Sequence, residues 1–192
     1  MERRILVING HPDPAPARLS AALASAYDAG AAADGHSVAR LDLGAMTFPF
    51  LQRNEDFLTE PDHPDIVDAR AEILRADHLV FIYPLWLGGP PAQLKAFMEQ
   101  VSRAQFALTT GAGGLPRGQL KGKSARVIVI MGMPAIAYRT IYRAHGVKAF
   151  NRSILGIAGV WPIRTSYFGM IGAPHRAEAA LKAVAKLGRA TA

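Results

Sequence analysis

The stretch 79–97, LVFIYPLWLGGPPAQLKAF, constrains the fold more than any other part of the chain. Its first five residues are all apolar, and such a continuous run is typical of a central strand in a parallel sheet that helices cover on both faces. Pro84 ends the run, and a turn rich in Gly and Pro then leads into an amphipathic helix over 92–101. Because a central strand needs neighbours, we interpret the other apolar runs as strands of the same sheet.

Four further segments have the character of strands, and helices are predicted between them. The strands cover 5–8, 37–43, 124–131 and 160–168. The first helix follows the loop 11–20 and ends at about residue 33, and the other helices cover 65–76, 92–101, 147–157 and 174–187. This alternation favours a doubly wound α/β fold, most simply a five-stranded parallel sheet in the order 2-1-3-4-5 with helices on both faces.

Two long irregular connections interrupt this alternation, and long loops in a compact domain are often functional. The first, 44–64, is either a dimer contact or pocket wall, or a plain surface loop. The second, 103–123, is interpreted as a lid that carries Phe106 toward the ligand.

The composition is that of one globular domain over residues 1–192, since half of the residues are hydrophobic and the mean hydropathy is +0.11. The absence of cysteine excludes disulfides, thiolate metal sites and cysteine nucleophiles. The first apolar run is too short for a signal peptide or a membrane span, so we expect a cytoplasmic protein without membrane insertion. No metal site is expected, because His63 and the Asp residues around it fit a solvated loop.

The charge balance favours an anionic small molecule over a nucleic acid. The chain carries 22 Lys and Arg against 15 Asp and Glu, which gives a net charge of +7. These basic residues are scattered along the sequence, which argues against nucleic acid as the main partner. A phosphorylated cofactor accounts more economically for an attraction to anions.

The loop 11–20, after the first strand, is the first candidate site. It leads into a helix, and a helix N-terminus presents free N–H groups and a partial positive charge to a phosphate. His11, Arg18 and Ser20 supply further donors. Neither G-x-G-x-x-G nor G-x-x-x-x-G-K-S/T occurs here, which argues against a classical dinucleotide fold and against a P-loop.

Two more loops open at the same edge of the sheet, because they follow the third and fourth strands. They are 84–89, which contains Trp86, and 131–134. If the first loop holds a phosphate, these two border a flat ring with apolar faces, and a flavin has that shape. Tyr138, Tyr142 and His145 follow the fourth strand and offer hydroxyl and imidazole groups, with ordinary packing as the alternative for each.

Three motifs resemble one known family. They are the H-P-D-P start of the first loop, the turn P-L-W-L-G-G-P-P-A-Q-L-K with its helix, and the Y…H-G segment after the fourth strand. Together they resemble the flavodoxin-fold NAD(P)H:quinone oxidoreductases, which include DT-diaphorase, the modulator-of-drug-activity-B reductases and the ancillary reductases of potassium-efflux systems. The resemblance spans nearly the whole chain and implies a flavodoxin-like, flavin-binding domain over residues 1–192.

The resemblance also implies a set of site residues. The cofactor-binding residues are His11, Arg18, Leu19 and Ser20 at the flavin phosphate, Pro84, Leu85, Trp86, Leu87 and Gly88 at the isoalloxazine ring, and Met131, Gly132, Met133 and Pro134 at the opposite ring edge. Tyr138 and His145 take the places of a catalytic tyrosine and histidine near the flavin and the quinone. Where the family commonly has Ser or Thr followed by Asn, this chain has Pro16-Ala17-Arg18, which shifts the expected phosphate contacts onto Arg18.

The function implied by the resemblance is a flavin-dependent NAD(P)H oxidoreductase that reduces quinones or similar small acceptors by two-electron, ping-pong hydride transfer. FAD is the expected cofactor with FMN as the alternative, NADPH or NADH is the electron donor, and the expected assembly is a homodimer. Two other functions stay open. One is a regulatory flavoprotein subunit in peripheral association with a membrane transporter, and the other is a non-enzymatic flavodoxin-type electron carrier.

Overall fold

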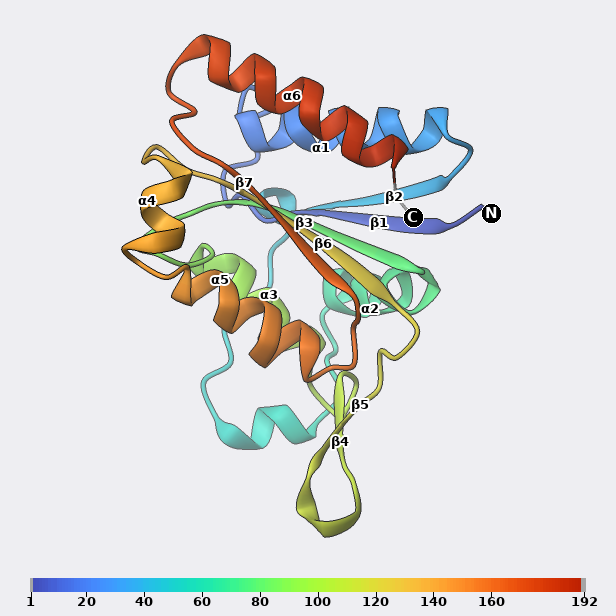
Figure 1. The fold of residues 1–192 in the computed structure, drawn as a ribbon. Helices are drawn as coiled ribbons and strands as arrows, with labels where there is room; N and C mark the ends of the chain where they lie inside the picture. The colour runs from blue at the N-terminus through green and yellow to red at the C-terminus, as the bar shows by residue number, and fades with distance from the viewer. Residues whose placement is uncertain (1, 191–192) are drawn as a thin grey trace.

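The computed structural model describes residues 2–190 and contains one sheet of five strands (Figure 1). The strands are β1 (Arg4–Asn9), β2 (Ser37–Asp42), β3 (His78–Pro84), β6 (Ser124–Ile130) and β7 (Ile163–Phe168). Their order is β2-β1-β3-β6-β7, and every neighbouring pair is parallel. The predicted order 2-1-3-4-5 and the flavodoxin-like architecture are therefore confirmed.

Strand β3 occupies the centre of the sheet, as its continuous apolar run predicted. All seven of its residues are buried, and Phe81 lies beside Ile8 of β1 and Val127 of β6. Successive side chains of a strand point to opposite faces of the sheet. Strand β3 consequently contributes to two separate cores, with Val80 in one and Phe81 in the other.

Helices α1 (Leu19–Ala33) and α6 (Pro174–Arg189) lie side by side on one face of the sheet (Figure 1). Two glycines allow their close approach. A Cβ at Gly30 would stand 2.2 Å from the carbonyl oxygen of Ala185, and a Cβ at Gly188 would stand 2.3 Å from that of Tyr27. The contact closes the apolar core that these helices share with β1, β3 and β6.

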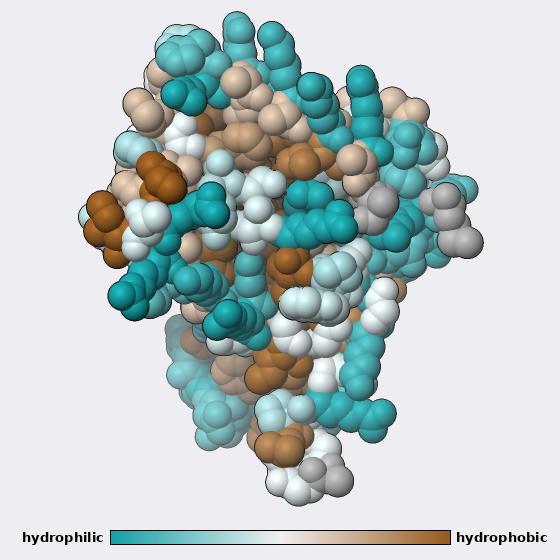
Figure 2. Space-filling model, viewed as in Figure 1, coloured by the Kyte–Doolittle hydropathy of each residue, from teal (hydrophilic) through white to brown (hydrophobic). Residues whose placement is uncertain are grey.

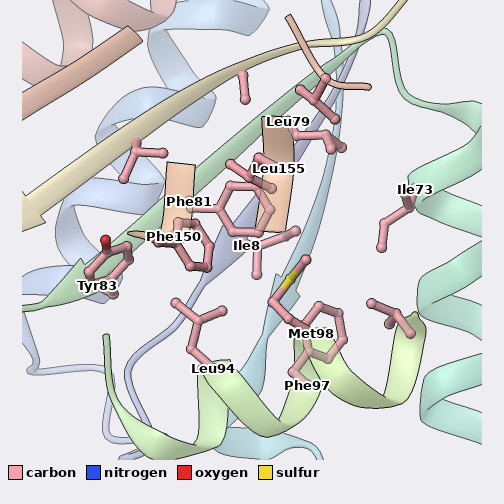
Figure 3. Close-up of a cluster of buried hydrophobic side chains, with 14 of the residues drawn as sticks. Ile8, Ile73, Leu79, Phe81, Tyr83, Leu94, Phe97, Met98, Phe150 and Leu155 are labelled. Carbon is pink, nitrogen blue, oxygen red and sulfur yellow. The ribbon is translucent and has the colours of Figure 1, made fainter. Parts of the chain in front are cut away.

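The other face is covered by α2 (Pro64–Arg75), α3 (Ala92–Val101) and a helical segment formed by α5 (His145–Ala149) and η4 (Phe150–Gly156). Figure 3 shows Phe150 and Leu155 of η4 beside Phe81 of β3, with Leu94 and Phe97 of α3 closing the cluster. The rings of Phe81 and Phe150 meet edge to face with centroids 5.3 Å apart, an arrangement that aromatic pairs favour. This core fixes the position of α5 and of the loop that precedes it.

Two predicted elements begin at different residues. The helix before the fifth strand begins two residues earlier than expected, at His145, and its second part, η4, is a π-helix. The fifth strand begins at Ile163, three residues later than expected. Pro162 has no N–H group for the ladder, and the N–H of Trp161 donates to the oxygen of Lys123 (2.8 Å) in the loop before β6.

The connection 103–123 is not a lid over the carboxyl edge of the sheet. It forms a hairpin of β4 (Leu108–Thr110) and β5 (Pro116–Gly118), joined by η3 (Ala112–Gly114). Figure 1 shows this hairpin projecting away from the carboxyl ends of the strands. The guanidinium group of Arg70 lies 4.7 Å from the ring centroid of Phe106. The expectation that Phe106 approaches the ligand is wrong, because α3 has already carried the chain to the opposite end of the sheet.

The connection 44–64 covers α3 and contains η2 (Asn54–Leu58), while η1 (Leu43–Ala45) leads into it. Side chains of the helices fasten it, since Gln100 donates to the oxygen of Pro49 (2.6 Å) and the buried Arg70 pairs with Glu60. No residue of this connection lines the cavity described below. It is therefore not a wall of that cavity, and its role as a dimer contact stays a prediction.

Candidate active site

A cavity of about 650 Å³ opens at the carboxyl edge of the sheet, where β3 and β6 end. Three segments surround it: the turn after β3, the loop after β6, and the region from α4 (Ala135–Thr140) to the start of α5. The lining residues are Leu85, Leu87, Gly88, Gly89, Met131, Gly132, Met133, Tyr138, Tyr142, His145 and Gly146. Two of the three predicted loops thus meet at one cavity, as the topology of a doubly wound sheet requires.

The turn after β3 has a strained backbone and presents an apolar side chain. Trp86 and Gly89 exchange two backbone hydrogen bonds, of 2.9 and 3.0 Å, and the residues between them, Leu87 and Gly88, have φ angles of 47° and 82°. Glycine adopts such angles freely, whereas leucine does so at a cost of roughly 1–2 kcal/mol. Leu87 is also fully exposed. Strain and exposure together at the mouth of a cavity indicate a residue that contacts a ligand.

The hydroxyl group of Tyr138 holds this turn in place. It donates to the carbonyl oxygen of Gly88 (2.8 Å) and accepts from the N–H of Val147 (3.4 Å), and burial raises the pKa of Tyr138. Gly146 packs against the same turn, since a Cβ there would stand 2.0 Å from the oxygen of Gly88. In this structure the hydroxyl of Tyr138 donates to Gly88 and so positions the turn, and the expected catalytic role of Tyr138 stays a prediction.

The loop after β6 offers bare backbone to the cavity. A Cβ at Gly132 would meet no atom within 4 Å, and the same holds at Gly89 in the turn after β3. Among residues 2–190, the N–H groups of Gly132 and Met133 have no hydrogen-bond acceptor. A flat ring with acceptor atoms at its edge fits this surface, because it needs open space beside the backbone and donors at its rim.

Two polar side chains of the cavity make no hydrogen bond to the described residues. His145 and Tyr142 are exposed, and neither side chain has a hydrogen-bond partner in the part of the chain that the structure describes. Arg143 and Ala144 between them have φ angles of 52° and 50°, and this tight turn brings both side chains to one opening. His145 was an expected catalytic residue. Tyr142 was considered for its hydroxyl group and belongs to the cavity as well.

The first loop lies beside the turn after β3, since the rings of His11 and Trp86 meet edge to face with centroids 5.7 Å apart. Local hydrogen bonds shape this loop: the N–H of Asp13 donates to Nδ1 of His11 (3.0 Å), and the Asp13 carboxylate pairs with Arg18. Burial, helped by the charge of Arg18, lowers the pKa of His11. His11 is therefore neutral at pH 7, and because Nδ1 accepts, Nε2 carries the proton.

The predicted phosphate contacts of Arg18 and Ser20 stay predictions, and the structure shows the surroundings of both side chains. The guanidinium group of Arg18 is already paired with Asp13, and the hydroxyl group of Ser20 is enclosed, with no partner among the described residues. The first turn of α1 contains no acidic side chain, and the N–H groups of Leu19 and Ser20 have no acceptor within residues 2–190. The loop thus offers backbone donors, which suit a phosphate at a helix start.

The remaining predicted contacts divide between the cavity and its surroundings. Pro84 is buried as the last residue of β3, and Trp86 stands half exposed at the rim. Pro134 lies in a different cavity, of about 470 Å³, between α4 and α6. Gly89 lies in the predicted loop 84–89, whereas Gly146 was missed, although it belongs to the His-Gly pair of a motif that carried the resemblance.

The helix that carries Tyr138 has exposed apolar side chains. Ile136 in α4 and Ile141 directly after it are exposed, and Figure 2 shows hydrophobic side chains (brown) at the end of the molecule where α4 lies. Within residues 2–190, no group of three His, Asp or Glu side chains could hold a metal ion. The site combines an apolar pocket, backbone donors and an imidazole.

Comparison with known proteins identifies the family. A family model described as a flavodoxin-like fold matches residues 3–190. The chain belongs to this family, and the resemblance seen in its motifs is confirmed.

Individual relatives agree with this assignment. The Streptococcus mutans protein Smu.1420 aligns with a TM-score of 0.81 and 26% identity, over 97% of this chain and 99% of that chain. The NAD(P)H:quinone oxidoreductase from Methanothermobacter marburgensis aligns with a TM-score of 0.84 and 24% identity, over 98% of this chain and 96% of that chain. An FMN-dependent NADH:quinone oxidoreductase of Bordetella petrii is 36% identical over 101 residues, which are 52% of this chain and 47% of that protein. This chain thus spans about half the length of that curated relative.

Proposed function

We propose that this protein is a flavin-dependent NAD(P)H oxidoreductase that reduces quinones or similar small acceptors by two-electron transfer. The observation that carries this proposal is the cavity at the carboxyl edge of the sheet, where bare backbone at Gly88 and Gly132 borders an apolar space. Free N–H groups at the start of α1 lie on the neighbouring loop. A flat ring that carries a phosphate needs these features together. The relative from Bordetella petrii, named as a quinone oxidoreductase, supports the same function.

FMN is the proposed cofactor. The N–H groups of Leu19 and Ser20 would hold its phosphate, and those of Gly132 and Met133 would hold one edge of its ring. FAD was the first expectation, but the FMN-dependent names of several relatives favour FMN. A single phosphate group also suits a first loop in which Arg18 is already paired.

When bound, the flavin supplies two-electron transfer from a reduced nicotinamide to a quinone. The protein's own residues orient the reactants and control charge. Leu87 and Trp86 present apolar surface at the opening and exclude water from it. The N–H groups of Gly132 and Met133 stabilise negative charge at the ring edge. An imidazole nitrogen of His145 can deliver a proton to a quinone oxygen.

The experiment that tests this function is steady-state oxidation of NADPH and NADH by the purified, FMN-loaded protein with a simple quinone and no protein partner. We expect oxidation to depend on both FMN and the quinone, with the parallel reciprocal plots of a ping-pong mechanism. A protein that binds FMN but passes electrons only to another protein would be an electron carrier. A protein that binds no flavin would contradict the proposal.

We also propose that two copies of the chain associate around the mouth of the cavity. Leu87 is exposed in the lining of the cavity, Ile136 and Ile141 are exposed in and directly after α4, and apolar side chains on a surface often mark an interface. Light scattering should then give twice the chain mass of 20.6 kDa. A monomer at assay concentrations would contradict this arrangement.

A cytoplasmic location and an association with a transporter stay predictions. No helix within residues 2–190 is both long enough and apolar enough to cross a bilayer. Co-purification with a membrane protein is the measurement that tests the association.

A further inference from the structure

A separate cavity of about 310 Å³, here called the Trp161 cavity, lies between the α5–η4 segment and the start of β7. Its lining residues are Lys148, Asn151, Arg152, Gly156, Trp161 and Ile163. The cavity thus combines a large aromatic ring, two cations and an amide, and none of its residues is acidic.

Trp161 is the most unusual member of this set because its indole is 76% exposed while its backbone is fixed. Its N–H donates to the oxygen of Lys123, and the next residue, Pro162, accepts from the N–H of Ala125, both at 2.8 Å. Because these hydrogen bonds hold the backbone, the exposed indole is presented at a defined position where a flat ring can stack on it. The facing segment η4 is a π-helix, a conformation that is rare and often found at functional sites.

The charge around this cavity is strongly positive. No Asp or Glu occurs between Glu99 and Glu178, whereas eleven Lys and Arg residues do. Among the described residues, Lys148 and Arg152 form no ion pair. Two unpaired cations beside an exposed ring suit a ligand that carries both phosphate groups and an aromatic base.

The Trp161 cavity and the active-site cavity share one helical segment. His145 lines the active-site cavity, Lys148 follows it by three residues, and Arg152 follows Lys148 by four, which keeps them near one face of the helix. Because α5 continues directly into η4, His145 and Arg152 lie about two turns apart on one continuous helical segment. A ligand with a ring at each end and phosphates between them can follow this face from one cavity to the other.

We propose that the Trp161 cavity binds the adenosine-phosphate end of the pyridine dinucleotide donor. The indole of Trp161 stacks on the adenine, and Lys148 and Arg152 pair with the phosphate groups. The inference rests on the proposed function, because it places the nicotinamide end near His145. NADPH, which carries one phosphate more than NADH, gains more from the two cations and is the preferred donor.

Binding of adenosine 2′,5′-bisphosphate tests the site without any redox chemistry. Calorimetric titration into the FMN-loaded protein should show saturable binding, and both Trp161→Ala and Arg152→Gln should weaken it by about tenfold. Trp161→Phe, which keeps a ring, should restore most of the affinity. Lys182→Gln on the exposed side of α6 removes the same charge elsewhere and should change the affinity less than twofold. Absence of binding, or equal affinities for all four variants and the wild type, would overturn the proposal.

Kinetics separate a failure of this inference from a failure of the proposed function. In Arg152→Gln the KM for NADPH should rise about tenfold, while kcat and the KM for the quinone stay within twofold. An active enzyme whose KM for NADPH is unchanged in this variant refutes the Trp161 cavity and leaves the function intact. If the wild type oxidises neither dinucleotide, the proposed function fails, and the titration alone decides whether the cavity binds the bisphosphate.

Discussion

Among the glycines that line the cavity, Gly146 and Gly132 should respond in opposite ways to an added methyl group. At Gly146 an added Cβ would stand 2.0 Å from the oxygen of Gly88, so Gly146→Ala must displace the turn after β3. We expect it to lower the free energy of unfolding by about 1–3 kcal/mol. At Gly132 the Cβ meets no protein atom. Gly132→Ala should leave the stability of the flavin-free protein unchanged and should weaken FMN binding, because the methyl group occupies the space of the ring.

Chemical unfolding of the flavin-free variants and titration with FMN measure these two effects separately. Wild-type affinity for FMN in Gly132→Ala would mean that the ring does not lie against the loop after β6. Unchanged stability in Gly146→Ala would mean that α5 can move away from the turn.

Tyr138 and His145 line the same cavity but have different environments, so their removal should have different effects. Tyr138→Phe leaves the oxygen of Gly88 without its donor and should cost about 1 kcal/mol of stability, with weaker FMN binding and little change in kcat at saturating FMN. His145→Gln should keep the stability and lower kcat for the quinone by roughly 10- to 100-fold. Unfolding curves and turnover of both variants check this. A large loss of kcat in FMN-saturated Tyr138→Phe would restore its catalytic role.

At the scale of elements, Arg70 of α2 fastens the connection 44–64. Its side chain donates to the oxygen of Val101 (3.0 Å), pairs with Glu60 and stacks on Phe106. Arg70→Met leaves buried oxygens without a donor, and we expect a loss of about 2 kcal/mol or more, with faster proteolysis within 44–64. Arg75→Met on the same helix removes only an exposed pair with Glu72 and should cost less than about 1 kcal/mol. Equal losses in both variants would contradict this account.

His78, at the start of β3, makes stability depend on pH. Burial and then the charge of Arg126 lower its pKa from 6.5 to about 4. Between pH 6.5 and pH 4, His78 therefore binds a proton in the unfolded chain but not in the folded chain. The free energy of unfolding falls as the pH drops through this range, by up to about 3 kcal/mol. Asp28 acts in the opposite direction, because burial raises its pKa to about 6 and folding then favours its protonated form.

Comparison with a variant isolates the contribution of His78. His78→Asn keeps a polar group near Ser124, the partner of Nδ1 at 2.7 Å, but does not titrate. Acidification from pH 7 to pH 4.5 should destabilise this variant less than the wild type, and with Asp28 still titrating it can even stabilise the variant. The same pH dependence in both proteins would show that His78 is not the group responsible.

The elements that the sequence predicted well are those with a strong local pattern. The apolar run of β3 and the Gly-Pro turn after it determine a central strand and a following helix without help from distant residues. The path of 103–123 could not be predicted in this way. It depends on Arg70 and Phe106, which lie 36 positions apart in the sequence and meet only in the folded chain.

At the scale of the whole molecule, topology alone brings the candidate loops to one edge of the sheet, and this is why the location of the site could be predicted. The orientation of single side chains could not. The hydroxyl of Tyr138 donates to the oxygen of Gly88, a residue 50 positions away, and the hydroxyl of Ser20 is buried in the packing of α1. The backbone strain at Leu87 could not be predicted from the sequence either, because its positive φ accompanies the two backbone hydrogen bonds between Trp86 and Gly89.

The central claim is that the cavity between the turn after β3 and the loop after β6 holds a flavin that exchanges electrons with small molecules. The most direct measurement is the visible absorption spectrum of the FMN-loaded protein without oxygen, recorded after addition of NADPH and again after addition of a quinone. We predict one tightly bound FMN per chain, loss of the flavin absorption with NADPH and its full return with the quinone. A protein that retains no FMN, or whose bound flavin responds to neither reagent, would contradict the account.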